Sequence, residues 1–143
     1  MKKRFELLEH TADAYIAAYG ASLEEAFENA ALATSEVMTD TRKVKPKVEE
    51  QVEVKAKDEY ALLYNWLEEI IVKFDIQNRL YSRFKISTIK PTSNGFKLKA
   101  KIWGEPFDPE RHPQKVGVKA VTYHRMAIIK KPNMVTVEFI LDI

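Results

Sequence analysis

Two segments of the chain repeat apolar residues at the three- and four-residue steps of an amphipathic helix. The first begins at Ser22-Leu23-Glu24-Glu25, a capping box in which the Ser22 hydroxyl accepts from the backbone of Glu25 and the carboxylate returns to the cap. Asp58 can cap the second, which we expect to be the more buried helix. The stripes that face the core are Leu23, Ala26, Phe27, Ala30, Thr34, Val37 and Met38 in the first helix, and Leu63, Trp66, Leu67, Ile70, Ile71 and Phe74 in the second.

Most of the remaining chain alternates apolar and polar residues, which is the pattern of half-buried strands. Asn94-Gly95 and Pro132-Asn133 each predict a tight turn between two of these strands. Residues 104–113 contain three prolines and are expected to form a loop. The predicted strands cover residues 49–56, 84–88, 96–102, 116–129 and 134–141.

This order of elements predicts an α+β fold with one mixed, largely antiparallel sheet and two amphipathic helices packed on one face. A chain of 143 residues has the length of one domain, so we expect residues 1–143 to form a single domain. Apolar residues make up 45% and charged residues 31% of the chain. These proportions are typical of a soluble globular protein, and no apolar run approaches the roughly 20 residues that span a membrane.

The charge and the lack of cysteine exclude several classes of site. The 23 basic and 21 acidic residues leave a net charge of +2, so binding of nucleic acid by bulk charge is not indicated. No cysteine is present, which excludes disulfides, thiolate metal sites and cysteine nucleophiles. The basic start Met1-Lys2-Lys3-Arg4 has no apolar segment after it, so it is not a secretory signal, and we expect a cytoplasmic protein.

Three short clusters could carry chemistry. Residues 9–13 place His10 and Asp13 where polar residues interrupt an apolar stretch, although such residues are also common in turns. Residues 118–126 include Lys119 and His124 on a strand with no cleanly apolar face, which an amphipathic edge strand also explains.

The third cluster is the pair Asp142 and Ile143 after the last predicted strand. A side-chain carboxylate and the terminal carboxylate lie together there, and a cation would reduce their repulsion. Alternation places Asp142 away from the main core face, so a solvated chain end explains it equally well.

These clusters, taken in order, resemble the archease family. The match runs from the first predicted strand to the last residue. It rests on Glu9-His10-Thr11-Ala12-Asp13, Tyr19 to Glu28, Ala61 to Glu69, Gly104 to Asp108, Val118 to Met126 and Asp142-Ile143. One departure is Ala14-Tyr15, where the family commonly has an apolar residue and glycine, and a bulky Tyr15 would narrow the approach to Asp13.

The resemblance implies that the chain is a protein activator, not an enzyme. Archeases activate the RtcB-type tRNA-splicing RNA ligase by promoting guanylylation of its active-site histidine and multiple turnover. The resemblance therefore implies that the chain acts on tRNA indirectly, through the ligase. The implied metal ligands are Asp13, Asp142 and Ile143, with Ca²⁺ as the first choice of divalent cation and Mg²⁺ or Mn²⁺ as alternatives. Lys119 is the implied functional lysine, and His10 and His124 are candidates for support.

Two other readings stay open at the level of sequence. A free-standing metal-dependent phosphoester hydrolase would use Asp13 and Asp142 to hold the ion and His10 or His124 as base. A chaperone-like or RNA-binding module would use the row Lys97, Lys99 and Lys101, which alternation places on one strand face. The sequence leaves the oligomeric state undetermined.

Overall fold

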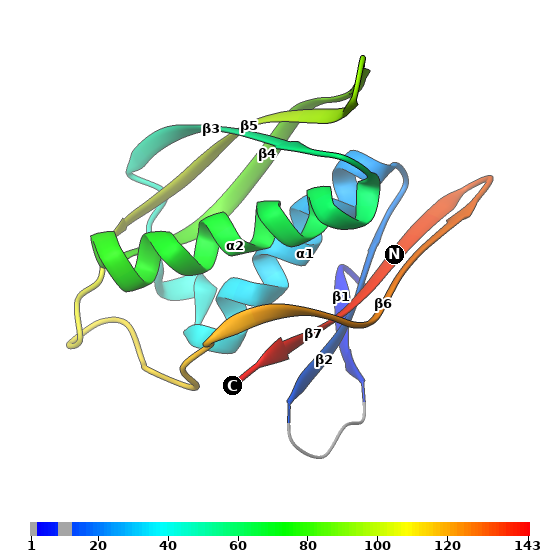
Figure 1. Cartoon of the computed structure of the whole chain (residues 1–143). Helices are drawn as coiled ribbons and strands as arrows, with labels where there is room; N and C mark the ends of the chain where they lie inside the picture. The colour runs from blue at the N-terminus through cyan, green and yellow to red at the C-terminus, as the bar shows by residue number, and fades with distance from the viewer. Residues whose placement is uncertain (1–2, 9–12) are drawn as a thin grey trace.

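Two helices lie between two antiparallel sheets in the computed structural model, which describes residues 3–8 and 13–143 (Figure 1). One sheet has the strand order β1-β2-β7-β6, and the other has the order β3-β5-β4. The helices are α1 (Leu23–Met38) and α2 (Glu59–Gln77), and a short 3-10 helix covers Thr41–Lys43. The strands are β1 (Phe5–Leu8), β2 (Ala14–Gly20), β3 (Val48–Ala56), β4 (Arg79–Thr92), β5 (Gly95–Pro106), β6 (Ala120–Lys131) and β7 (Met134–Asp142).

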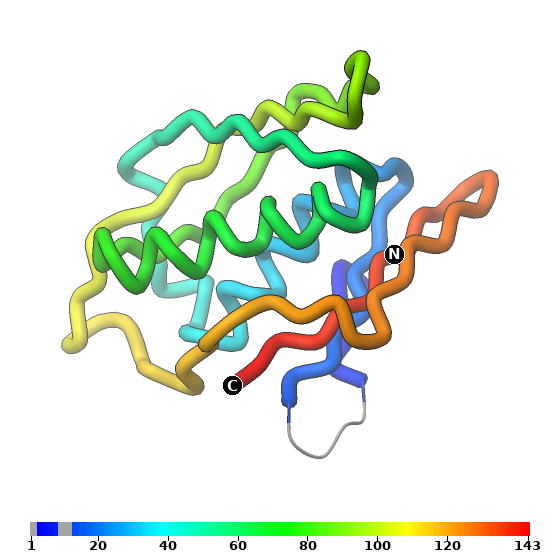
Figure 2. Tube along the Cα trace, viewed as in Figure 1, coloured from blue at the N-terminus to red at the C-terminus, as the bar shows by residue number. Residues whose placement is uncertain are grey.

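The α+β class is confirmed, and the strands divide into two sheets instead of forming one. Helix α1 contacts β2 and β7 on one side and β4 on the other, while α2 contacts β6 on one side and β3, β4 and β5 on the other. The Cα trace shows the same layering (Figure 2). Because both sheets pack on the helices, one helix layer supplies buried surface to both. All strand pairs described are antiparallel.

Both helix starts are confirmed at the predicted caps. The Ser22 hydroxyl accepts from Glu25 N at 3.1 Å, and Glu25 returns to Ala21 N, one residue before the cap. Asp58 accepts from Ala61 N at 2.8 Å. The expectation that α2 is the more buried helix was wrong: eight of the 16 residues of α1 are buried, against seven of the 19 in α2. No residue of α2 after Ile71 is buried, so its last six residues, 72–77, lower the buried share of that helix.

The strand around Gly104 is longer than expected. Residues 104–106 continue β5 instead of starting a loop, and the irregular segment begins at Phe107. Gly104 makes this possible because a Cβ built there would lie 1.8 Å from the carbonyl oxygen of Leu80 on β4. The two strands can therefore approach closely only where one has no side chain.

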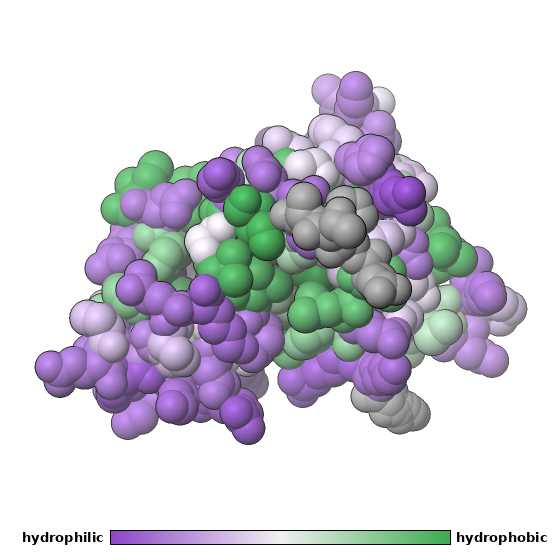
Figure 3. All heavy atoms as spheres, turned by 90° about the horizontal axis from the view of Figure 1, so that it is seen from below, coloured by the Kyte–Doolittle hydropathy of each residue, from purple (hydrophilic) through white to green (hydrophobic). Residues whose placement is uncertain are grey.

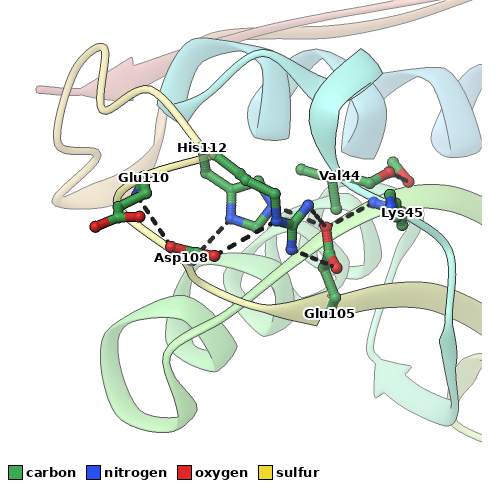
Figure 4. Close-up of polar contacts among 8 residues, drawn as sticks. Val44, Lys45, Glu105, Asp108, Glu110 and His112 are labelled. Carbon is green, nitrogen blue, oxygen red and sulfur yellow. Dashed lines mark hydrogen bonds and ion pairs between the residues drawn. The ribbon is translucent and has the colours of Figure 1, made fainter.

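A buried polar network holds the segment after β5 to the core (Figure 4). Glu105, 2% exposed, receives both Nη atoms of Arg111 at 3.0 and 2.8 Å and the backbone N–H of Lys45 at 2.8 Å. His112, 1% exposed, lies 2.8 Å from the same carboxylate through Nε2. Its Nδ1 accepts from Asp108 N at 2.9 Å, so Nε2 carries the hydrogen that is donated to Glu105.

Further contacts fix the rest of this segment, residues 107–119, up to β6. The backbone N–H of Lys115 donates to Met38 O at 3.0 Å, and its ammonium group lies 2.6 Å from Glu36. Val118 is buried in the core, and the N–H of Lys119 donates to Asp142 O at 2.7 Å. The segment is therefore irregular but held at several points, and it delivers Lys119 to the end of β7.

We expect Gly104→Ala to lower the free energy of unfolding by roughly 3 kcal/mol, because the new methyl group meets backbone atoms that cannot move aside. Chemical denaturation measures the change. Gly117→Ala is the matched control, since a Cβ at Gly117 meets nothing within 4 Å, and its effect should stay within about 1 kcal/mol. Equal effects of the two substitutions would contradict the close-approach argument.

Glu105→Gln tests the buried network. Hydrogen bonds from Arg111, helped by Lys45 N and His112, lower the pKa of the Glu105 carboxyl from its ordinary value of 4.5 to about 2. A depressed pKa stabilises the fold above the unfolded value, and this contribution is lost as the pH falls from about 4.5 toward 2. We expect the substitution to cost about 3 kcal/mol at pH 7.

Denaturation at pH values from 7 to 2 measures how much the Glu105 charge stabilises the fold and at which pH this stabilisation is lost. The difference between wild type and Glu105→Gln should shrink as the pH falls below about 4.5. Glu53→Gln, which removes an exposed carboxylate paired with Lys97, is the control and should cost less than about 1 kcal/mol. A constant difference across this pH range would show that the Glu105 charge is not what stabilises the segment.

Candidate functional site

The register of β7 with its two neighbours brings the predicted site residues to one end of a sheet. Strand β7 lies between β2 and β6. Ala14 of β2 pairs with Leu141 of β7, so Asp13, just before Ala14, lies beside Asp142, just after Leu141. On the other side Ala120 of β6 pairs with Asp142. Residues separated by more than a hundred positions in the chain thus meet at this sheet end.

Asp13 and Asp142, here called the acid pair, lie on the sheet face that points away from the helices. Val135, Val137, Phe139 and Leu141 belong to the core, so the alternating residues of β7, Asp142 included, point to the opposite face, as predicted. Asp13, Asp142 and Ile143 are each half-buried. Ile140 is also buried although it lies on the outer face, beside Tyr15 of β2 and Thr122 of β6. The outer face is therefore partly packed and is not an open solvated surface.

Lys119 reaches this end of the sheet from the β6 side. Its backbone N–H donates to the carbonyl of Asp142 at 2.7 Å, which ties the two residues together through main-chain atoms. The residue itself is exposed. Its position therefore depends on the network of Glu105 and His112 and on the contacts of Lys115, because these fix the segment that precedes it.

Tyr15 follows Asp13 by two residues and shares its strand face. The Tyr15 hydroxyl lies 3.3 Å from Oε1 of Glu138, to which it donates. Glu138 pairs with Ala17, two residues farther along β2, so this bond turns the hydroxyl away from Asp13. The end of the tyrosine ring therefore points along β2 toward Glu138.

The two histidine candidates have different outcomes. His10 lies outside the described residues, as do Glu9, Thr11 and Ala12 of the same cluster. His124 is exposed and sits in a wide bulge of β6, where four residues, 123–126, stand opposite the single residue Phe139 of β7. Simple alternation along residues 118–126 was therefore wrong beyond Thr122, because the bulge resets which face each side chain occupies.

The three-dimensional arrangement also reveals groups that sequence reasoning missed. Glu105, Arg111 and His112 form the buried network, and the only signal for it was an acid inside an apolar strand followed by basic residues. Tyr64 of α2 stacks on Tyr123 in the bulge of β6, and the Tyr60 hydroxyl accepts from the N–H of Ile128 just beyond it. No helix in the described part of the chain is both long and apolar enough to cross a membrane.

Comparison with known proteins gives a consistent family assignment. The model of the Archease protein family matches residues 5–143. The protein archease of Sulfurisphaera tokodaii is 45% identical over 141 residues, which are 99% of each chain. The protein archease of Pyrococcus abyssi is 49% identical over 131 residues, which are 92% of each chain.

Solved structures agree with this assignment. The solution structure of protein 1598 of Methanobacterium thermoautotrophicum matches with a TM-score of 0.81 and 40% identity, over 98% of this chain and 99% of that one. A Thermotoga maritima protein, described as an archease and possible chaperone, matches with a TM-score of 0.63 over 100% of this chain and 98% of its own. Its identity is 19%, so it shows the fold alone. The family model and the close relatives together show that this chain belongs to the archease family.

Proposed function

We propose that this archease activates an RtcB-type tRNA-splicing RNA ligase by promoting attachment of GMP to the active-site histidine of the ligase. The observation that carries the proposal is the convergence of Asp13, Asp142, Ile143 and Lys119 at one end of the β2-β7-β6 ladder. The two carboxylates can bind a metal ion, and the lysine beside them adds a positive charge. Together they can face a phosphate-bearing site on another protein.

The donor set fits a hard divalent cation. Asp13 and Asp142 supply carboxylate oxygens, and Ile143 supplies a main-chain oxygen, so every ligand is oxygen and Ca²⁺ is preferred, with Mg²⁺ or Mn²⁺ as alternatives. Ca²⁺ takes roughly 6–8 oxygens, which exceeds what these three residues offer. Water or groups of the ligase and its nucleotide would complete the shell. When bound, the cation would neutralise phosphate charge at the ligase.

The roles of this chain's own residues follow from their positions. Asp13 and Asp142 would hold the cation, and both are half-buried at the sheet end. Lys119, exposed but tied to Asp142 through its backbone, offsets further phosphate charge. His124 lies a few residues along β6, near enough to support contact with the partner.

An independent hydrolase is less well supported. Among residues 3–8 and 13–143, no three side chains of histidine, cysteine, aspartate or glutamate come together as a metal-binding group. Two carboxylates and a lysine can position a phosphate, but the chemical step then needs groups from a partner. A chaperone-like role shares the protein partner with our proposal, but it predicts that loss of Asp13 or Asp142 has no specific effect.

The decisive experiment is guanylylation of purified ligase with labelled GTP. We expect wild-type protein to accelerate covalent GMP attachment, and Asp13→Asn or Asp142→Asn to reduce that acceleration about 100-fold, since loss of an outer-shell partner of a metal ligand already costs 10–100-fold. Lys119→Ala should also reduce it, because the phosphate charge is then less well offset.

Matched controls are Asp75→Asn, an exposed acid on α2, and Lys99→Ala, an exposed lysine on β5. Both should behave as wild type. The absence of any acceleration by wild-type protein would refute the proposed function. Full activity of both site variants would refute the role given to the acid pair.

Metal binding can be tested on this protein alone. In calorimetric titration with Ca²⁺, Asp13→Asn and Asp142→Asn should each weaken binding at least about tenfold, because each removes one ligand of the proposed set. Repeating the titration with Mg²⁺ and Mn²⁺ ranks the ions. Asp75→Asn should leave the affinity unchanged, and equal affinities in all variants would place any bound cation elsewhere.

A further inference from the structure

Three tyrosines lie together near the proposed site, two of them exposed and Tyr64 half-buried against the core. The patch, here called the tyrosine patch, consists of Tyr60 and Tyr64 on α2 and Tyr123 on β6. The rings of Tyr64 and Tyr123 stack with centroids 4.6 Å apart and planes 12° from parallel. The exposed fraction is 54% for Tyr123 and 41% for Tyr60. Monomeric proteins scatter exposed apolar residues singly, so clustered aromatic rings on a surface indicate contact with a partner.

The three rings are held in place although those of Tyr60 and Tyr123 are exposed. Tyr60 and Tyr64 lie one helical turn apart on α2, and the Tyr60 hydroxyl accepts from the backbone N–H of Ile128 at 3.3 Å. Stacking fixes Tyr123 against Tyr64. A partner that lands on these rings therefore loses little conformational entropy in ordering them, which is how tyrosines act as anchors in interfaces.

Arg125 lies in the same bulge of β6 as Tyr123, and its backbone is strained. Arg125 has φ 57°, in the left-handed region that costs a residue with a side chain roughly 1–2 kcal/mol. Its side chain is exposed and forms no ion pair with any residue that the structure describes. Strained and exposed residues in bulges cluster at functional sites, and Arg125 is such a residue in the bulge that also carries Tyr123.

The surroundings favour a protein partner over RNA. Single-stranded RNA sites join aromatic platforms to a groove of cations that follows the backbone. Here two acids, Asp58 and Glu59, directly precede Tyr60, and Glu59 already engages Lys130 at 2.7 Å. Tyrosine and arginine within a border of mixed charge is the composition of protein interface hot spots.

The patch also lies close to the residues that the partner must reach. Tyr123 is three residues beyond Ala120, which pairs with Asp142, so the two sites are within about 10 Å along β6. In the view from below, apolar surface gathers over the middle of the molecule (Figure 3). The acids point to the sheet face away from the helices, whereas Tyr123 packs toward α2, so a partner that contacts both must reach around the edge strand β6.

We infer that the tyrosine patch and Arg125 are the docking surface for the ligase, distinct from the acid pair that acts on it. The ligase would place an apolar side chain on the tyrosine rings and a carboxylate against Arg125. This inference rests on the proposed function for the identity of the partner. It predicts that the patch determines the affinity for the ligase, whereas the sheet end determines the rate of guanylylation at saturating archease.

The test measures binding and activation separately with full-length proteins. Titrating archease into ligase by calorimetry gives Kd, and guanylylation at increasing archease gives the half-saturating concentration and the plateau rate. We expect Tyr123→Ala and Arg125→Gly each to raise Kd and the half-saturating concentration at least 10-fold, with an unchanged plateau rate. Glycine at 125 accepts the positive φ, so Arg125→Gly removes the guanidinium without straining the fold.

Ile76→Ala is the matched control, because Ile76 is an apolar residue of α2 with 78% exposure that lies outside the patch. It should bind and activate as wild type. The inference would be overturned if both patch variants bound the ligase with the wild-type Kd. It would also be overturned if wild-type protein bound tRNA without ligase and the variants did not. The Kd for the ligase tests the docking role of the patch even if wild-type protein fails to speed GMP attachment. Such a failure would overturn only the proposed function.

Discussion

The position of β7 between β2 and β6 is the constraint on which the candidate site depends. Its backbone groups pair on both sides, so its register is fixed twice, once by β2 and once by β6. A slip of one residue would turn Val137, Phe139 and Leu141 out of the core. Burial of these three side chains therefore also fixes Asp142 beside Asp13 and beside the segment that ends in Lys119. Core packing and site assembly are enforced by the same ladder.

The helix layer explains why this ladder is stable. Trp66 of α2 is fully buried, and its indole N–H donates to Phe27 O of α1 at 2.8 Å, which satisfies the one polar atom that the ring brings into the core. The two helices thus act as one layer against which both sheets pack. The network of Glu105, Arg111 and His112 then joins the end of β5 to the segment leading to β6. The buried Glu105 carboxylate has hydrogen-bond partners from Lys45, Arg111 and His112, and these contacts hold the irregular segment in place.

The helices could be predicted because their caps depend on residues close together in the sequence. The arrangement of the strands could not, because it depends on contacts between distant parts of the chain. The caps at Ser22 and Asp58 act within four residues, so sequence alone located both helix starts. Alternation identified the buried face of β7, but period-two patterns do not identify a strand's neighbours, so the division into two sheets was not predicted. Pro91 was tolerated within β4 because that strand lies at the sheet edge. The candidate ligands came from family resemblance, whereas their meeting at one sheet end required the register.

The arrangement of the site fits a protein whose chemistry is completed by its partner. The sheet end offers two acids, a main-chain oxygen and one lysine, which can hold a cation and orient phosphate but provide neither nucleophile nor leaving group. Such a set contributes to catalysis only when another surface is pressed against it. The bulge of β6 supplies the means for that contact, because it sends Tyr123 to α2 and displays Arg125 while Ala120 stays paired with Asp142. Strand β6 thus carries Tyr123 and Arg125, which would contact a partner, and at Ala120 it pairs with the end of β7 that holds Asp142.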